Sequence, residues 1–419
     1  MAEFYDLVIR NARILGRDPS RTWDIGVSRG RIEEVREGIP SKGGVEVDAG
    51  GGLVTPPFAN PHLHACKVYT FLMLGEDAVR EYQSSGMGGA MAAIEIASKV
   101  KERYEESWIR RNAAKAMLDG VRYGALYVRA FVDVDTKARL EGIKALLKVR
   151  DALRDFMTIQ VVAFPQDGVV REPGAEELVR KAVELGADVV GGIPWIELSD
   201  EDEWTHINAM FEIAKEFDKD VAMLTDDAGD PGLRTTWKLA VKALKEGWVG
   251  RVTACHARAL ATYPKPSLLK VAELARKAGM SFVTDPHTGP LYLPFKELLR
   301  LGVNVALGQD DIADAYYPYG RNNMLEVAFL ASHITWSMTL SDMDTFIDMV
   351  TWRAAKAMNV RDYPTISPGD PANLLVHKGR TPYELIWAHE PPKYVVSRGR
   401  IVTESGKVVE ELARLVKEI

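Results

Sequence analysis

Short apolar runs alternate with amphipathic segments through most of the chain. The apolar runs lack strict alternation with polar residues, which is typical of parallel strands that are covered on both faces. Between them, apolar residues recur at helical spacing, most clearly over residues 207–217. The eight predicted strands are Leu53–Phe58, Leu126–Val134, Thr158–Phe164, Asp188–Ile193, Asp220–Leu224, Arg251–His256, Ser281–Thr284 and Val303–Leu307. Eight strand–helix units predict an α/β fold, a (β/α)8 or TIM barrel, with a doubly wound open sheet as the alternative.

Both ends of the chain carry a different pattern, short β-like runs punctuated by Gly, Pro, Asn and Asp. Neither end is long enough to bury much of a core by itself, so the two ends are predicted to pair with each other. The expected division gives residues 1–52 and 366–419 to a small β-sandwich subdomain with a terminal helix, and residues 53–365 to the barrel.

The strongest local signal for chemistry is a pair of histidines, His62 and His64, close to the first predicted barrel strand. Side chains two residues apart in a strand point the same way, so these two imidazoles can reach one point just past the strand's end. Two converging imidazoles are half of a divalent metal site. The alternative is a pair of unrelated loop histidines, because the spacing alone is common.

Polar residues also follow most of the other predicted strands. In a barrel, functional sites form at the carboxyl ends of the strands, where these side chains would meet. The residues are Gln166 after the third strand, Asp226 and Asp227 after the fifth, His256 at the end of the sixth, Asp285 and His287 after the seventh, and Asp310 and Asp311 after the eighth. Solvation alone does not explain so many histidines and carboxylates at strand ends, so this rim is the predicted functional site.

Composition narrows the range of partners. The chain has 419 residues, of which 47% are hydrophobic and 27% are charged, as in ordinary globular proteins. Its formal net charge of -6 gives no reason to expect a nucleic acid or an anionic membrane surface as a partner. Because it has two cysteines, no basic–apolar leader and no apolar stretch of about 18 residues, we expect a cytoplasmic protein.

Four segments resemble the metal-dependent amidohydrolase superfamily, and within it cytosine deaminase and its relatives. The segments are PPFANPHLH, VAFPQDG, RVTACHA and ALGQDDIADAYYPYGRNNML. The His-x-His pair is common to the superfamily, whereas FPQ and DD-x-x-D-x-x-YP-x-G are much more specific to the cytosine deaminase branch. The resemblance runs from about residue 4 to residue 405. It implies a hydrolase that deaminates a small planar nitrogen heterocycle (cytosine-like, pterin-like or triazine-like) by attack of a metal-bound hydroxide.

The resemblance also implies a role for each matching residue. The implied ligands of one divalent ion, zinc or iron, are His62, His64 and Asp310. The implied catalytic residues are Asp227, His256, Asp310 and Asp311. The implied substrate contacts are Gln166, Asp311, Tyr316 and Lys67. Asp227 occupies the position of the family's general acid and base, a glutamate, which carries a proton to the leaving nitrogen.

Several positions depart from the family pattern, among them Phe131 and Gln309 where the family has histidines, and one departure bears directly on the metal site. Leu224 stands where the resemblance places a metal-binding histidine on the fifth strand, and leucine has no donor atom. Three interpretations stay open: His256, Asp226 or His287 completes the coordination; three protein ligands and additional water hold the ion; or the site holds no metal. The prediction adds His256 to the ligand set.

Two other functions also stay open at this point. One is hydrolysis of a cyclic amide C–N bond, and the other is ligand binding by a degenerate, metal-poor relative. The expected partner is a small-molecule nitrogen heterocycle, and the resemblance allows a homo-oligomer. Of the remaining histidines, His206 is expected at a helix start and His333 in a helix core, both without chemistry.

Overall fold

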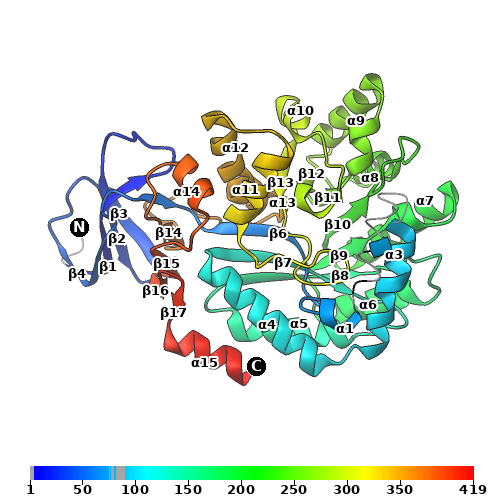
Figure 1. Cartoon of the computed structure of the whole chain (residues 1–419), viewed down its shortest axis with the longest axis horizontal. Helices are drawn as coiled ribbons and strands as arrows, with labels where there is room; N and C mark the ends of the chain where they lie inside the picture. The colour runs from blue at the N-terminus through cyan, green and yellow to red at the C-terminus, as the bar shows by residue number, and fades with distance from the viewer. Residues whose placement is uncertain (1–3, 75, 77–79, 82–89) are drawn as a thin grey trace.

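Two sheets organise the structure, a computed structural model that describes residues 4–74, 76, 80–81 and 90–419 (Figure 1). The larger body is an eight-stranded sheet whose parallel strands follow one another in chain order around a barrel. Its strands are β6 (Phe58–His64), β7 (Ala125–Asp133), β8 (Thr158–Phe164), β9 (Val189–Gly192), β10 (Asp220–Thr225), β11 (Val252–His256), β12 (Ser281–Thr284) and β13 (Asn304–Leu307). The predicted (β/α)8 barrel is confirmed.

The barrel closes between its first and last strands, β6 and β13. The backbone N–H of His64 donates to the carbonyl oxygen of Asp310 over 2.8 Å, and the N–H of Asp310 donates to the carbonyl oxygen of His62 over 2.9 Å. A parallel bridge pairs Leu63 with Asp310 at the same point. The backbone pairing that closes the barrel therefore also brings together residues that lie far apart in the sequence.

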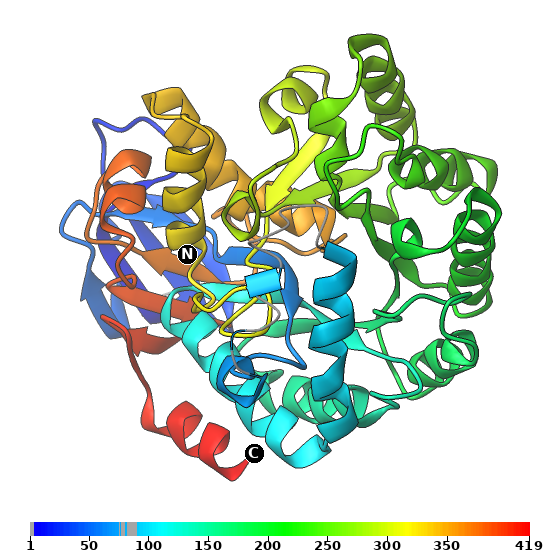
Figure 2. The same ribbon diagram turned by 45° about the vertical axis from the view of Figure 1, so that its right-hand side comes forward.

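Helices cover the outside of the barrel, as Figure 2 shows. They are α4 (Glu106–Arg122), α5 (Glu141–Leu153), α6 (Ala175–Glu184), α7 (Asp200–Glu216), α8 (Thr235–Lys245), α9 (Lys265–Lys277), α10 (Phe295–Arg300), α11 (Met324–Ile334), α12 (Leu340–Val350) and α13 (Trp352–Ala357). In α5 the buried residues Ile143, Leu146 and Val149 recur at the helical period and form the face that packs on β7 and β8. Among the described residues, no helix has both the length and the apolar character that a bilayer span requires.

Shorter segments follow several strand ends and carry part of the rim. After β6 come α1 (Phe71–Leu74), α3 (Ala90–Ala97) and the 3-10 helix η2 (Ser98–Arg103). The 3-10 helices η3 (Pro194–Ile196), η4 (Arg258–Thr262) and η5 (Pro286–Thr288) follow β9, β11 and β12. Because these turns begin directly at the carboxyl ends of the strands, their first residues face the rim where the predicted site residues lie.

Both chain ends form the second sheet, which is mixed and nine-stranded. Its strands are β1 (Phe4–Ile14), β2 (Trp23–Ser28), β3 (Arg31–Arg36), β4 (Lys42–Asp48), β5 (Leu53–Thr55), β14 (Leu374–Val376), β15 (Tyr394–Ser397), β16 (Arg400–Glu404) and β17 (Lys407–Val408). β5 joins the two ends, because it runs parallel to β1 and antiparallel to β14. The C-terminal part adds α14 (Pro382–Ala388) and α15 (Glu410–Glu418), of which α15 packs against α4.

The prediction of Leu53–Phe58 as the first barrel strand was wrong both in the residues that form a strand and in the sheet to which they belong. Its first half is β5 in the second sheet, and the first barrel strand is β6. Pro56 and Pro57 separate the two strands, because proline has no N–H to donate to a strand ladder and so ends the pairing. His62 and His64 consequently lie within the last residues of β6 and not beyond the end of a strand.

Candidate active site

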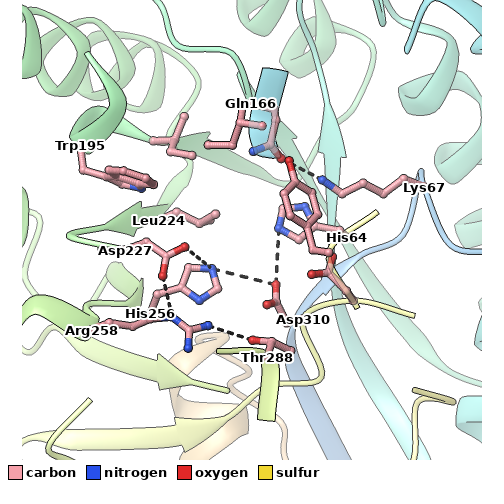
Figure 3. Close-up of a pocket in the computed structure, with 14 residues that line it drawn as sticks. His64, Lys67, Gln166, Trp195, Leu224, Asp227, His256, Arg258, Thr288 and Asp310 are labelled. Carbon is pink, nitrogen blue, oxygen red and sulfur yellow. Dashed lines mark hydrogen bonds and ion pairs between the residues drawn. The ribbon is translucent and has the colours of Figure 1, made fainter. Parts of the chain in front are cut away.

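Three imidazoles converge on one carboxylate oxygen at the carboxyl end of the barrel. Figure 3 shows two of them, those of His64 and His256, beside Asp310. The Nε2 atoms of His62 and His64 lie 3.0 and 3.6 Å from Oδ1 of Asp310. The Nε2 atom of His256 lies 4.0 Å from the same oxygen. Two overlapping triads have all their ligand atoms within 4.8 Å of one another, His62 with His256 and Asp310, and His64 with Asp310 and Asp311. Asp310 belongs to both triads and is the centre of the cluster.

The backbone conformation of two of these residues is strained. His256 and Asp310 have φ angles of 65° and 66°, in the left-handed region that residues with a Cβ rarely adopt. Pairing with β6 imposes this conformation on Asp310, and the N–H of Ala257 continues the pairing with β10 by donating to the carbonyl oxygen of Thr225 over 2.9 Å. Strain of this kind concentrates at functional sites, where the surrounding structure holds it in place.

The charge state of the cluster suits a cation. Burial lowers the pKa values of His62 and His64 well below the ordinary value, so both imidazoles keep a lone pair for a metal at neutral pH. Burial would also lower the pKa of His256, but the carboxylates of Asp227 and Asp285 raise it to about 9. The site therefore gathers negative charge that a proton on His256 balances, and a divalent ion would balance it as well. Imidazole nitrogens and a carboxylate oxygen are donors that zinc and iron accept, so the residues fit such an ion.

The three residues that could replace a ligand at Leu224 differ in their geometry. Leu224 is buried beside the cluster and lines the pocket. The carboxylate of Asp226 is engaged elsewhere, because it accepts the backbone N–H groups of Thr235 (2.7 Å) and Thr236 (3.0 Å) at the start of α8. The Nε2 atom of His287 lies 3.1 Å from the carbonyl oxygen of Gln309. Among the described residues, His256 is the one of the three that lies in a triad with Asp310.

A second set of charges surrounds His256 on the other side. Nε of Arg258 donates to Oδ1 of Asp227 over 2.6 Å, and its Nη2 donates to Oδ2 of Asp285 over 3.0 Å. The other carboxylate oxygen of Asp285 lies 3.0 Å from Nδ1 of His256. The other oxygen of Asp227, Oδ2, lies 4.0 Å from Nε2 of His256. Asp285 thus orients the imidazole, and Arg258 orients Asp227, with one oxygen of Asp227 left on the pocket side.

A pocket of about 500 Å³, counted to its open mouth, lies above the cluster. On one side Nζ of Lys67 donates to Oε1 of Gln166 over 2.9 Å and lies 5.0 Å from the ring centroid of Tyr316. Burial would lower the pKa of Lys67, but the charges of Asp133 and Asp311 raise it, so the ammonium stays charged. Oδ1 of Asp311 is buried and, among the described atoms, has no hydrogen-bond partner. This side of the pocket therefore offers an ammonium, an amide, a carboxylate and an aromatic face.

The opposite side of the pocket is apolar, as the positions of Trp195 and Leu224 in Figure 3 show. Ile193, two residues before Trp195, and Ile94, on α3, also line the pocket. The structure brings every residue that we predicted as a catalytic or substrate contact to this one pocket. The apolar wall and Arg258 were not predicted from the sequence. Apolar residues at strand ends cannot be distinguished from core residues in a sequence. Arg258 comes two residues after His256, but no motif in the sequence marks it as a functional residue.

Known proteins resemble this chain in sequence and in structure. Residues 45–403 match the amidohydrolase family. The N-isopropylammelide isopropyl amidohydrolase of Pseudomonas sp. (strain ADP) is 31% identical over 98% of this chain and 100% of its own length. The pterin deaminase of Rhizobium rhizogenes is 25% identical over 94% of this chain and 90% of its own length. The crystal structure of 5-methylcytosine deaminase from Klebsiella pneumoniae, liganded with phosphonocytosine, superposes with a TM-score of 0.87 and 27% identity, covering 95% of this chain and 98% of that one.

Proposed function

The chain belongs to the amidohydrolase family, and from this premise we propose that it hydrolyses the bond between a ring carbon of a small planar nitrogen heterocycle and an exocyclic amine. It is a C–N hydrolase that acts on non-peptide bonds. The observation that carries the proposal is the convergence of the imidazoles of His62, His64 and His256 on Oδ1 of Asp310 at the floor of a pocket. A proton carrier, Asp227, stands beside this floor.

The proposed ligands of one divalent ion, zinc or iron, are His62, His64, His256 and Asp310. His256 takes the place of the donor that Leu224 cannot supply, and Asp285 supports it by holding its Nδ1. A divalent ion held there would supply Lewis acidity, which makes a water molecule nucleophilic near neutral pH.

Asp227 carries the proton. Its Oδ1 is fixed by Arg258, whereas its Oδ2 is on the pocket side and can exchange a proton. Asp227 accepts a proton as water adds to the ring carbon and returns it to the exocyclic nitrogen, which leaves as a neutral amine. The second proton of the water moves to the ring nitrogen, so the ring carbon keeps the oxygen as a carbonyl and the reaction balances with water as the only co-substrate.

The two sides of the pocket suit two parts of the proposed substrate. Lys67, Gln166 and Asp311 offer hydrogen-bonding groups to the polar edge of a ring. The ring of Tyr316, beside Lys67, offers a flat surface for stacking. On the opposite side, Trp195 and Leu224 would pack against a small alkyl group on the leaving amine. The relative from Pseudomonas is an N-isopropylammelide isopropyl amidohydrolase, which supports an alkylamine as one leaving group to test.

The direct test is release of amine by protein reconstituted with Zn(II) or Fe(II). The panel contains aminated pyrimidines, pterins and triazines, each with a free amine and with an N-isopropyl amine, together with cyclic amides. We expect stoichiometric amine release from at least one aminated ring and no opening of the cyclic amides. Ring opening would favour the cyclic amide hydrolase instead. Ring binding without turnover by metal-loaded protein would overturn the proposal and favour a binding protein.

Two matched histidine variants accompany this test. His62→Ala should remove both the bound metal and the turnover, because His62 lies 3.0 Å from Oδ1 of Asp310. His333→Ala changes an exposed histidine on α11 and should leave both unchanged. Metal content is measured by elemental mass spectrometry beside amine release, and the circular dichroism spectrum of each variant distinguishes a folding defect from the loss of a ligand.

A further inference from the structure

A buried histidine–glutamate pair lies outside the catalytic cluster. Nδ1 of His206 lies 2.7 Å from Oε1 of Glu197, and neither side chain has any exposed surface. We expected His206 at the start of a helix, but it lies in the middle of α7, inside the protein. Two titratable side chains buried in contact are costly unless their hydrogen bonds are satisfied, so their other partners matter.

Glu197 holds the segment that follows β8. Its Oε1 accepts the backbone N–H groups of Val169 (2.6 Å) and Val170 (3.1 Å), and its Oε2 accepts the N–H of Arg171 (3.0 Å). Burial alone would raise the pKa of Glu197, but the hydrogen bonds from His206 and these backbone groups lower it below its ordinary value. One carboxylate therefore fixes three consecutive amides of the loop that begins at Gln166.

His206 holds a second segment, the one that follows β9. The backbone N–H of Ile193 donates to Nε2 of His206 over 3.1 Å. Because a backbone N–H can only donate, Nε2 is the acceptor, and the proton of the imidazole is on Nδ1, from which it donates to Glu197. Ile193 and Trp195 belong to the apolar wall of the pocket. The pair thus connects the polar edge of the pocket, at Gln166, to its apolar wall.

Two glycines leave room for the pair. A Cβ added at Gly168 would lie 2.9 Å from Oε1 of Glu197, and a Cβ added at Gly192 would lie 3.0 Å from Nε2 of His206. Both distances are shorter than side chains tolerate without a shift, so the absence of a side chain at each position permits the close approach. Gly168, in the loop after β8, and Gly192, the last residue of β9, therefore let the two segments reach the pair.

We propose that Glu197 and His206 are positioning residues that fix the Gln166 edge of the pocket relative to the Ile193–Trp195 wall, and so set which substrate fits between them. The effect on substrates rests on the proposed function of this pocket. Neither residue touches the substrate, because both side chains are buried behind the loops they hold. Their loss should therefore weaken substrate binding and leave the metal and the chemistry largely intact.

The test compares His206→Leu with His206→Gln. Leucine cannot bond to either loop, whereas the amide of glutamine can donate to Glu197 and accept from Ile193, as the imidazole does. In His206→Leu we expect KM to rise about tenfold or more, because the lost hydrogen bonds include one to a charged group. The kcat should change less than about threefold, and the metal content should not change. In His206→Gln we expect a KM close to that of the unmodified protein.

A readout without turnover separates this inference from the proposed function. Hydrogen exchange followed by mass spectrometry should show faster exchange of the peptides that cover residues 169–171 and 193–196 in His206→Leu, and near-normal exchange in His206→Gln. His377→Leu is the matched control, a buried histidine that lines no part of this pocket, and it should leave KM and these peptides unchanged.

Each outcome decides the inference. Unchanged exchange of both peptides in His206→Leu would overturn it, as would a His206→Gln variant no better than His206→Leu, because His206 would then act by packing alone. If no aminated ring is turned over by the unmodified protein, the proposed function fails, and the exchange data still decide whether the pair positions the two loops.

Discussion

Nε of Arg258 donates a hydrogen bond to Oδ1 of Asp227 over 2.6 Å, and the side chain of Arg258 is almost fully buried. The same guanidinium donates to Asp285 and to the hydroxyl of Thr288. Because Asp285 and Thr288 fix the guanidinium, Arg258 holds Asp227 in one orientation. One oxygen of this carboxylate is fixed and the other faces the pocket. This arrangement is suited to a general acid–base group, which accepts a proton and returns it on the same side of the pocket.

Replacement of Asp227 by asparagine should abolish proton transfer and keep the shape of the pocket. Asp227→Asn should lower kcat by about 10² to 10⁴-fold, the usual contribution of a general acid–base group, and leave metal content unchanged. Steady-state kinetics of amine release measure the effect. Asp230→Asn, on the exposed part of the same loop, is the control and should behave like the unmodified protein. Equal kcat values in the two variants would assign the proton transfer to another residue.

The replacement of the ligand at Leu224 can be tested through two histidines. His256→Ala should lose the bound ion, because its Nε2 lies 4.0 Å from Oδ1 of Asp310 in the cluster. His287→Ala should keep the ion, because Nε2 of His287 is engaged with the carbonyl oxygen of Gln309. Zinc content after dialysis against a chelator measures both. Loss of zinc in His287→Ala alone would place the fourth ligand in η5, directly after the seventh strand.

Much of the architecture follows from the hydrophobic pattern. Apolar runs without alternation, separated by amphipathic helices, predicted the barrel, and the pairing of the two chain ends predicted the second sheet. The first strand was wrong because residues 53–58 are mostly apolar, and apolar character alone does not show which sheet a strand joins. The proline pair at 56–57 decides it, since it interrupts the strand ladder at this point.

The polar part of the site could be predicted because its residues sit at the ends of strands, where a barrel has no structural use for so many charges. The apolar wall could not, since Ile193 and Trp195 look like core residues until a pocket is seen beside them. His206, which was expected at a helix start, is buried in the middle of α7 and hydrogen-bonded, and His333, which was expected in a helix core, is exposed. One sequence does not show which face of a helix turns inward when both faces carry apolar residues.

Restoring a histidine at Leu224 should strengthen the metal site. Leu224→His places a fourth strand-borne imidazole beside the cluster, and we expect the ion to resist a chelator about ten- to a hundredfold better. The same change removes part of the apolar wall, so KM for a substrate with an N-alkyl amine should rise relative to one with a free amine. Chelator competition and paired kinetics measure the two effects. Unchanged resistance to the chelator would mean that the ion does not lie beside Leu224.

Acid stability should depend on His377, which lies between the barrel and the second sheet with Nε2 3.0 Å from Oγ1 of Thr55. Burial lowers the pKa of His377 from 6.5 to about 3. Between these pH values the unfolded chain binds a proton that the folded chain does not. The free energy of unfolding should therefore fall as the pH drops below about 6.5, by up to about 1.4 kcal/mol per pH unit, with no effect above it.

His377→Gln keeps a group that can bond to Thr55 and removes this titration. Urea unfolding at pH 7 and pH 5 should show a loss of stability in the unmodified protein that is about 2 kcal/mol larger than the loss in the variant. His333→Gln, at an exposed histidine, should retain the full pH dependence of the unmodified protein. Because the other acid-sensitive groups, including His62 and His64, are the same in all three proteins, their contributions cancel in the comparison. Identical pH dependence in the unmodified protein and His377→Gln would show that His377 can be protonated within the folded protein.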